Sequence, residues 1–113
     1  MSNEKMTKFI ESVFCVFQSI KSKAETQKDR RQYMIALLIF NYVNSLAKEY
    51  NVNLKNIQMQ EPINLIPIFE YINHKNIEYY DFSKINMADV DTNNKDDLER
   101  FVLSHVYYIT QQA

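Results

Sequence analysis

The sequence predicts an all-α fold, a small bundle of four to five helices around a central hydrophobic helix. The stretch from Gln27 to Asn51 contains the apolar run 33–40, and its apolar residues cover most of the girth of a helix. The chain has 0 glycines and 2 prolines, which disfavours tight β-hairpins and rules out glycine-rich phosphate loops. The most strand-like piece, 77–82, has no obvious partner strand.

Length and composition point to one helical domain, residues 1–113. Hydrophobic residues make up 46% and charged residues 24%, as in folded globular proteins. The net charge of -1 argues against a dedicated nucleic-acid or membrane-surface binder. The single cysteine, Cys15, is expected to be a small buried hydrophobe, and it fits a reducing compartment. No signal peptide or membrane span is evident, so we expect a cytoplasmic location without membrane contact.

The first two predicted helices carry the strongest core pattern. One helix is expected from Asn3 to Ser22 with Ser2 or Asn3 as its N-cap, because apolar residues recur along it at three- and four-residue spacing. A polar hinge is expected at 21–25. Thr26 is then predicted to cap the central helix, with Asp29 as its capping-box partner. A short hinge makes the two helices antiparallel neighbours.

The second half of the chain is predicted to hold two further helices. Pro62 and Pro67 bracket the first of them, which Asn64 caps and 73–76 ends. The segment 77–82 is expected to be an extended connector or a helical turn, and Ser83 to cap a short turn through Ile85 and Met87. The last helix is expected from just after Asn94 to about Gln111, with acidic residues in its first turn.

One motif on the last helix suggests chemistry. Arg100, His105 and Tyr107 read R-x4-H-x-Y, which resembles the signature of the HEPN superfamily, small helical proteins that include RNA-cleaving toxins. The resemblance implies metal-independent RNA cleavage at a dimer interface. Arg100 would steady the phosphate, and His105 would act on the 2′-hydroxyl or the leaving group. The alternative is a partly buried core histidine and a solvated arginine, because residues five apart on one helix point about 140° apart.

Two charged segments allow further interpretations. The run Asp89–Asn94 resembles the opening of a calcium loop, D-x-D-x-N, but Asn94 and Arg100 stand where that loop needs glycine and a bidentate glutamate. An acidic turn that caps the last helix is therefore preferred, and no metal, nucleotide or redox cofactor is predicted. A basic cluster near the first hinge could meet nucleic-acid phosphates or simply be solvated; it comprises Lys21, Lys23, Lys28, Arg30 and Arg31.

The aromatic content favours a binding function. The chain has 8 tyrosines and 7 phenylalanines, including the pairs Tyr79–Tyr80 and Tyr107–Tyr108. Adjacent residues cannot both face one core, so some of these rings should be exposed, and exposed tyrosines are common anchors at protein interfaces. The alternative is that the rings lie flat over the bundle.

We therefore predict a small intracellular, non-enzymatic module that binds another protein, or itself, through a tyrosine-rich helical face. Adaptor, inhibitor, immunity-type and complex-subunit roles all fit this reading. The richness in Asn, Ile, Lys and Tyr is typical of an AT-rich genome such as that of a phage or mobile element.

Overall fold

The computed structural model describes residues 2–81 and 86–111, and within these ranges it contains four α-helices and no strand. The helices are α1 (Asn3–Gln27), α2 (Arg30–Glu49), α3 (Ile66–Lys75) and α4 (Lys95–Gln111), with short 3₁₀ helices η1 (Leu54–Asn56) and η2 (Met87–Asp89) in the connections. The prediction of an all-α fold is confirmed for the described residues.

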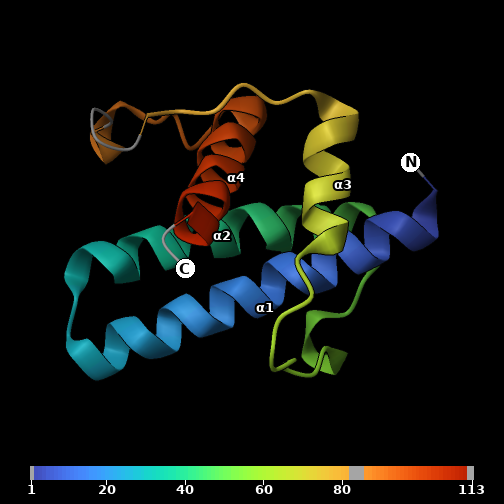
Figure 1. The fold of residues 1–113 in the computed structure, drawn as a ribbon, viewed down its shortest axis with the longest axis horizontal. Coiled ribbons are helices and arrows are strands. Elements are labelled where there is room, and N and C mark those ends of the chain that lie inside the picture. Colours follow the sequence, from blue (N-terminus) through green and yellow to red (C-terminus); the bar gives the residue numbers. More distant parts are fainter. Residues whose placement is uncertain (1, 82–85, 112–113) are drawn as a thin grey trace.

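The helices α1 and α2 form a long antiparallel hairpin, on one face of which α3 and α4 both stand (Figure 1). Helix α3 packs against α1, and α4 packs against α2. The segment 51–65 folds against the other side of α1, where the Ser12 hydroxyl donates to the Asn64 carbonyl at 2.9 Å. The predicted central helix, α2, thus contacts both α1 and α4, but α3 is held by α1, so the hairpin as a whole forms the centre.

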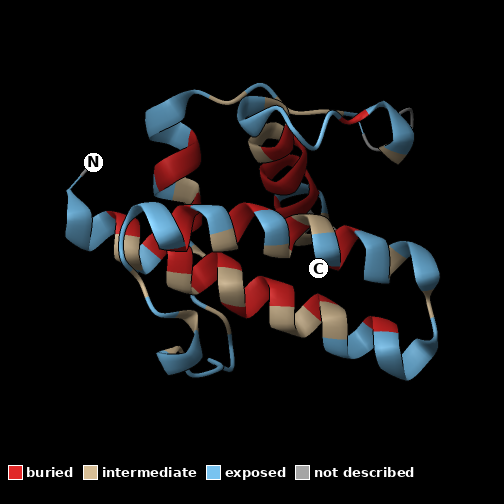
Figure 2. Cartoon of the chain, turned by 180° about the vertical axis from the view of Figure 1, so that it is seen from behind, coloured by how far each residue is buried: buried red, intermediate tan, exposed pale blue. Residues whose placement is uncertain are grey.

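The core lies where the hairpin meets the two shorter helices, and buried residues line the facing sides of all four (Figure 2). On α1 and α2 they follow the helical period, which is why these sequences form helices with one dry face. The largest fully buried side chains are Tyr42, Phe9, Phe101, Ile10, Ile35, Ile39, Ile68, Leu103, Val13, Val43, Val102 and Val106.

The turn of the hairpin differs from the prediction. Helix α1 begins as expected, with Ser2 as N-cap, but it runs through the predicted hinge to Gln27. Lys28 ends it in the left-handed conformation, at φ 55°, where its N–H reaches the Ala24 and Glu25 carbonyls. Glycine or asparagine is the usual residue at such a position, so a lysine there is uncommon. Thr26 is not a cap, because its hydroxyl donates to the Ser22 carbonyl inside α1 at 2.9 Å.

Asp29 is the N-cap of α2, and its Oδ1 accepts from the Gln32 N–H at 3.1 Å. We expect Asp29→Ala to lower the free energy of unfolding by about 1 kcal/mol, because an N–H at the helix start loses its acceptor. Thr26→Ala, at the predicted cap, should change it by less than about 0.5 kcal/mol. Urea denaturation of both variants measures the difference. A larger loss in Thr26→Ala would mean that α2 starts where the sequence pattern placed it.

The third helix agrees with its predicted signals. Pro67 lies in the first turn of α3, and Asn64 Oδ1 accepts from the Ile66 N–H at 3.2 Å, one residue before the formal N-cap Leu65. Asn76 ends the helix in the left-handed conformation, at φ 53°. Asn51, after α2, adopts the same conformation, so asparagine takes the place of glycine at these positions.

The connection from α3 to α4 begins with the segment 77–81, which has no regular secondary structure and runs extended in Figure 1, one of the two predicted alternatives. Phe82, the last residue of the predicted piece, lies outside the described residues. The expected turn at Ser83 and Ile85 lies outside the described residues, while Met87 begins η2. Helix α4 then starts at Lys95, directly after Asn94, as predicted. None of the helices within residues 2–81 and 86–111 contains a hydrophobic stretch of the length that a bilayer span requires.

Candidate functional site

The segment 77–81 lies along α4. Side chains of α4 form hydrogen bonds with the backbone of this segment, and the Tyr80 side chain forms one with α4. The Tyr80 N–H donates to Ser104 Oγ at 2.9 Å, which gives the buried Ser104 hydroxyl a partner. Arg100 Nε donates to the Glu78 carbonyl at 2.7 Å. The polar residues Arg100 and Ser104 thus occupy one side of α4 because a strand-like segment without a partner strand needs hydrogen bonds there.

Tyr80 is held inside this arrangement and is only partly exposed. Its hydroxyl donates to Asp97 Oδ1, and the Arg100 guanidinium lies over its ring, 4.0 Å from the centroid. Burial, and then the Asp97 carboxylate, raise the pKa of Tyr80. The hydrogen bond from Tyr80, and then the Asp91 N–H at 2.9 Å, lower the pKa of Asp97. A change at Tyr80 therefore acts on the fold as well as on the surface.

The other three tyrosines of the two pairs present aromatic surface, which we call the tyrosine face: Tyr79, Tyr107 and Tyr108. Tyr79 and Tyr107 stack with their centroids 4.1 Å apart and their planes 18° apart. Tyr107 is 37% and Tyr108 44% exposed, whereas Tyr79 is half-buried. Burial, and then the neighbouring Tyr107, raise the pKa of Tyr79. The two rings are therefore already stacked in the chain without a partner.

The residues of the R-x4-H-x-Y motif face different surroundings. Arg100 contacts Tyr80 and Glu78, while Tyr107 stacks on Tyr79. His105 is only 3% exposed. Burial, and then the charge of Arg31 on α2, lower the pKa of His105 to about 4. The structure does not bring the three side chains together on one open surface, and above this pH the imidazole is neutral.

A polar contact between the helices was not anticipated from the sequence. The Tyr42 hydroxyl of α2 and the Tyr71 hydroxyl of α3 both donate to Glu99 Oε2 of α4, at 2.5 and 2.7 Å. Phe9 of α1 stacks on Tyr71, centroid to centroid at 4.0 Å, and meets Tyr42 edge-on at 6.5 Å. We call these four residues the tyrosine–glutamate cluster; they come from all four helices. Burial, and then the hydrogen bond to Glu99 or the charge of Glu99, raise the pKa of both tyrosines.

The acidic segment before α4 uses its side chains as local caps. Asp91 Oδ1 accepts from the Asn93 N–H at 3.0 Å, and Asn94 Oδ1 accepts from the Asp97 N–H at 3.1 Å. These contacts match the preferred interpretation of an acidic turn. Over residues 2–81 and 86–111, no group of three or more His, Cys, Asp or Glu side chains is placed to hold a metal ion.

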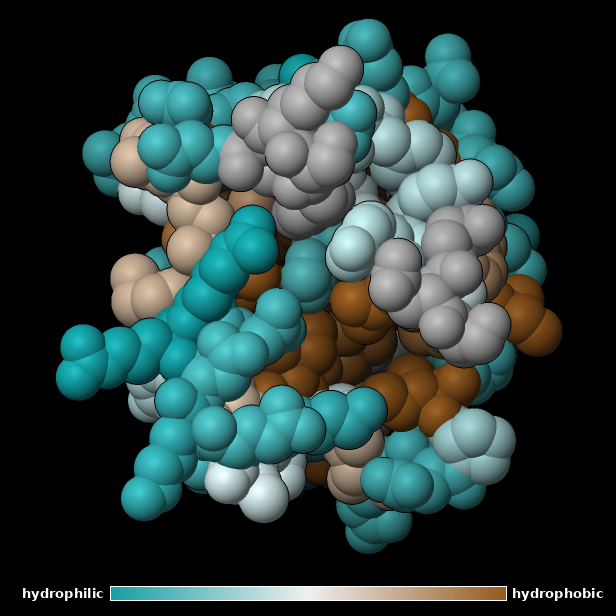
Figure 3. Space-filling model, turned by 60° about the vertical axis from the view of Figure 1, so that its left-hand side comes forward, coloured by the Kyte–Doolittle hydropathy of each residue, from teal (hydrophilic) through white to brown (hydrophobic). Residues whose placement is uncertain are grey.

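The basic cluster surrounds the turn of the hairpin. Four of its five members are exposed, and Lys21 lies 3.6 Å from Glu25 Oε1 in an ion pair one helical turn apart. Seen from the end of the molecule that carries the turn, hydrophilic side chains surround hydrophobic residues gathered at the centre of the face (Figure 3). Two members of the basic cluster, Lys28 and Arg30, line a hollow together with Tyr33 and Met34, so they border apolar side chains.

Comparisons with protein-family models, with curated proteins and with solved structures found no match to this chain.

Proposed function

We propose that this chain is a non-enzymatic protein-binding module that uses the tyrosine face, which α4 and the segment 77–81 form together. The observation that carries the proposal is the stacked pair Tyr79–Tyr107 beside the exposed Tyr108. Tyrosine rings give large contact area with a polar tip, and they lose little conformational freedom when they bind. A pair already stacked in the free protein loses still less.

The fixed surroundings of the face also support a binding role. Tyr79 belongs to a segment that the contacts of Tyr80 with Ser104, Asp97 and Arg100 hold against α4. A partner would therefore meet a rigid surface, which favours specific association. Adaptor, inhibitor, immunity-type and complex-subunit roles inside the cell, including that of a phage or mobile element, belong to this same proposal.

The HEPN-like ribonuclease remains the alternative drawn from the sequence. The contacts of Arg100 with Glu78 and Tyr80, and the burial of His105, give it no support. A general acid or base has to reach the proton that it transfers, and His105 is 3% exposed.

The test compares what tagged variants capture in their own host. We expect the wild-type chain to bring down a stoichiometric protein partner, and Tyr107→Ser combined with Tyr108→Ser to lower its yield at least about tenfold, because the exposed rings are lost. Tyr50→Ser is the matched control, since Tyr50 is 36% exposed at the end of α2. Mass spectrometry measures the partner, and circular dichroism checks that each variant is folded.

Two results would contradict this proposal. Equal capture by the double variant and the wild-type chain would place the binding surface elsewhere. RNA in the eluate without a protein partner, together with cleavage that His105→Ala abolishes, would support the ribonuclease instead.

A further inference from the structure

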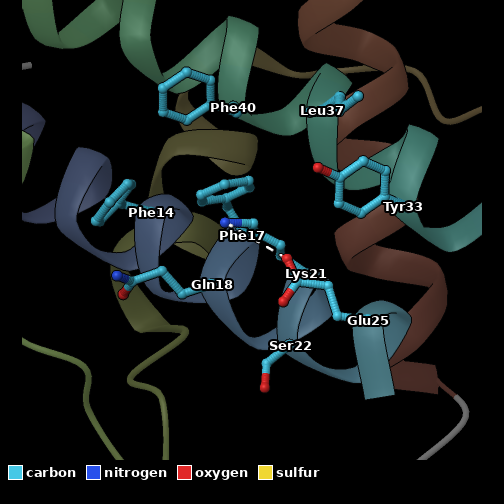
Figure 4. Close-up of a pocket in the computed structure, with 9 residues that line it drawn as sticks. All are labelled: Phe14, Phe17, Gln18, Lys21, Ser22, Glu25, Tyr33, Leu37 and Phe40. Carbon is cyan, nitrogen blue, oxygen red and sulfur yellow. Dashed lines mark ion pairs between the residues drawn. The ribbon is translucent and has the colours of Figure 1, made fainter. Parts of the chain in front are cut away.

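The hairpin carries an apolar groove on the face turned away from α3 and α4. We call it the hairpin groove; Phe14 and Phe17 of α1 and Tyr33, Leu37 and Phe40 of α2 line it (Figure 4). Its volume is about 520 Å³. Phe9 and Tyr42 are the residues of α1 and α2 in the tyrosine–glutamate cluster. Phe14 and Leu37, each five residues away from them, point about 140° away on the same helices.

Phenylalanine rings line one end of the groove, and polar residues of α1 line the rest of its α1 side: Gln18, Lys21, Ser22 and Glu25. The Phe17 ring lies 5.7 Å from that of Phe14 and 5.1 Å from that of Phe40, centroid to centroid, so three phenylalanines form a row across the hairpin. Tyr33 is 37% and Leu37 38% exposed beside this row. Single exposed apolar residues are ordinary, but a contiguous patch in a groove marks a site for another apolar surface.

The chain itself covers the neighbouring part of this face. Val52 and Leu54 pack against the core beside Phe14 and Phe40 and line a second hollow that shares these two phenylalanines. The open part runs along α1 from Phe14 to Glu25. At 1.5 Å per residue this distance is about 16 Å, the length of a helix of about three turns. The groove thus continues a surface on which the protein already accepts apolar side chains.

The charge around the turn indicates the sign of the occupant. Between residues 21 and 31 there are five cations and two anions. Both anions already have partners, because Glu25 pairs with Lys21 and Asp29 caps α2. Lys28 and Arg30 line a further apolar hollow that adjoins the groove and shares Tyr33 with it. The surplus of positive charge at this end favours an acidic partner.

The wall of the groove also holds a polar atom without a partner. Gln18 lines the groove, and its Oε1 is buried with no hydrogen bond to any described residue. A buried acceptor left in this state is unfavourable, and a hydrogen-bond donor from an occupant of the groove would relieve it.

We infer that the hairpin groove binds an amphipathic helix of a partner protein, about three turns long, with acidic residues flanking its apolar face. A third helix laid between two antiparallel ones buries its apolar stripe as in a helical bundle, and recognition follows the i, i+3/i+4, i+7 pattern. The inference goes beyond the proposed function, because it uses a different surface, the face of the hairpin opposite α4. The two binding sites can therefore be tested separately.

The first experiment selects ligands from a displayed library of twelve-residue helical segments that vary in apolar pattern and charge. We expect the purified chain to enrich segments with apolar residues at helical spacing and Asp or Glu beside them. Fluorescence anisotropy of the selected peptides should then show binding at least about tenfold weaker to Leu37→Glu, which places a charge in the groove. Ile66→Glu is the matched control, since Ile66 is 64% exposed at the start of α3, and should bind as the wild type does.

The second experiment tests the charge. Arg30→Glu should weaken binding of the acidic peptides and reduce its salt dependence. An acidic residue in the first turn of α2 suits the helix dipole, and circular dichroism of the variant checks that weaker binding does not come from a loss of structure.

Several outcomes would overturn the inference. They are no enrichment, enrichment of basic or uncharged segments, and equal affinity for Leu37→Glu and the wild-type chain. A dimer that forms with rising concentration and that Leu37→Glu abolishes would show that a second copy of this chain occupies the groove. That result would overturn the inference as well. The variant with Tyr107→Ser and Tyr108→Ser should keep its peptide affinity. Loss of peptide affinity in this variant would show that the peptides bind the tyrosine face and would overturn the inference. Failure of the groove experiments alone would not contradict the proposed function of the tyrosine face.

Discussion

Glu99→Ala should lower the free energy of unfolding by about 2–4 kcal/mol, because two buried tyrosine hydroxyls lose their common acceptor. Tyr42 is 1% and Tyr71 4% exposed, so water does not readily replace the carboxylate. Urea denaturation measures the loss. Glu99→Gln, which keeps an acceptor oxygen, should fall between the wild type and Glu99→Ala. Glu70→Ala, at an exposed position of α3, is the control and should change stability by less than about 0.5 kcal/mol.

The pKa values of the two tyrosines give the same prediction a second readout. The pKa of Tyr42 and that of Tyr71 are both raised in the fold. Their contribution to stability is therefore complete below about pH 10, where unfolded tyrosine ionises, and is lost as the pH rises further. Glu99→Ala removes the hydrogen bond and the negative charge, so its stability should fall less steeply above pH 10. Equal slopes, or an unfolding free energy like that of Glu70→Ala, would mean that Glu99 does not hold the tyrosines.

Acid should destabilise the fold through His105. The pKa of His105 is lowered to about 4, whereas unfolded histidine has a pKa near 6.5. The folded state then binds fewer protons than the unfolded state between these values, so stability is present above pH 6.5 and is lost as the pH falls toward 4. The loss is on the order of 3 kcal/mol. Thermal or urea unfolding at pH 7.0 and 4.5 measures it.

His105→Leu is the variant that isolates this effect. It should lose less stability between the two pH values than the wild-type chain, whatever its stability at pH 7. His74→Gln, at an exposed position near the end of α3, should keep the wild-type pH dependence. An unchanged pH dependence in His105→Leu would show that other groups cause the acid response. It would also leave room for a protonated His105, as the ribonuclease alternative needs.

Helices with local signals could be predicted closely, and α4 is the best example. Asn94 and the acidic residues after it mark its start in the sequence, and the structure begins it at Lys95. The end of α1 was predicted too early. Beyond Ile20 only Ala24 is buried, because the last turns of α1 lie at the turn of the hairpin, away from α3 and α4 (Figure 1). A polar stretch there looks like a hinge although the backbone remains helical.

The candidate sites divide in the same way. The rule that adjacent tyrosines cannot share one core predicted some exposure, and Tyr107 and Tyr108 are exposed. The role of Tyr80 was out of reach, because Asp97 and Arg100 meet it only after the connector folds back on α4. The contact of Tyr42 and Tyr71 with Glu99 could not be predicted from their spacing in the sequence either. Helical periodicity shows which residue faces inward, not which inward residues from different helices meet.

The tyrosine–glutamate cluster also bears on how the chain reaches its fold. Tyr42 and Glu99 are separated by 57 positions, whereas α1 and α2 are joined by a two-residue turn and can pair locally. Contacts between residues far apart in the sequence form more slowly, because the chain loses the entropy of closing a long loop before the contact stabilises it. During synthesis the ribosome makes α2 well before α4, which covers one side of it in the folded chain. Until α3 and α4 have been made, the hairpin exposes the apolar residues that these two helices later cover. During that time chaperones and other proteins can bind this surface.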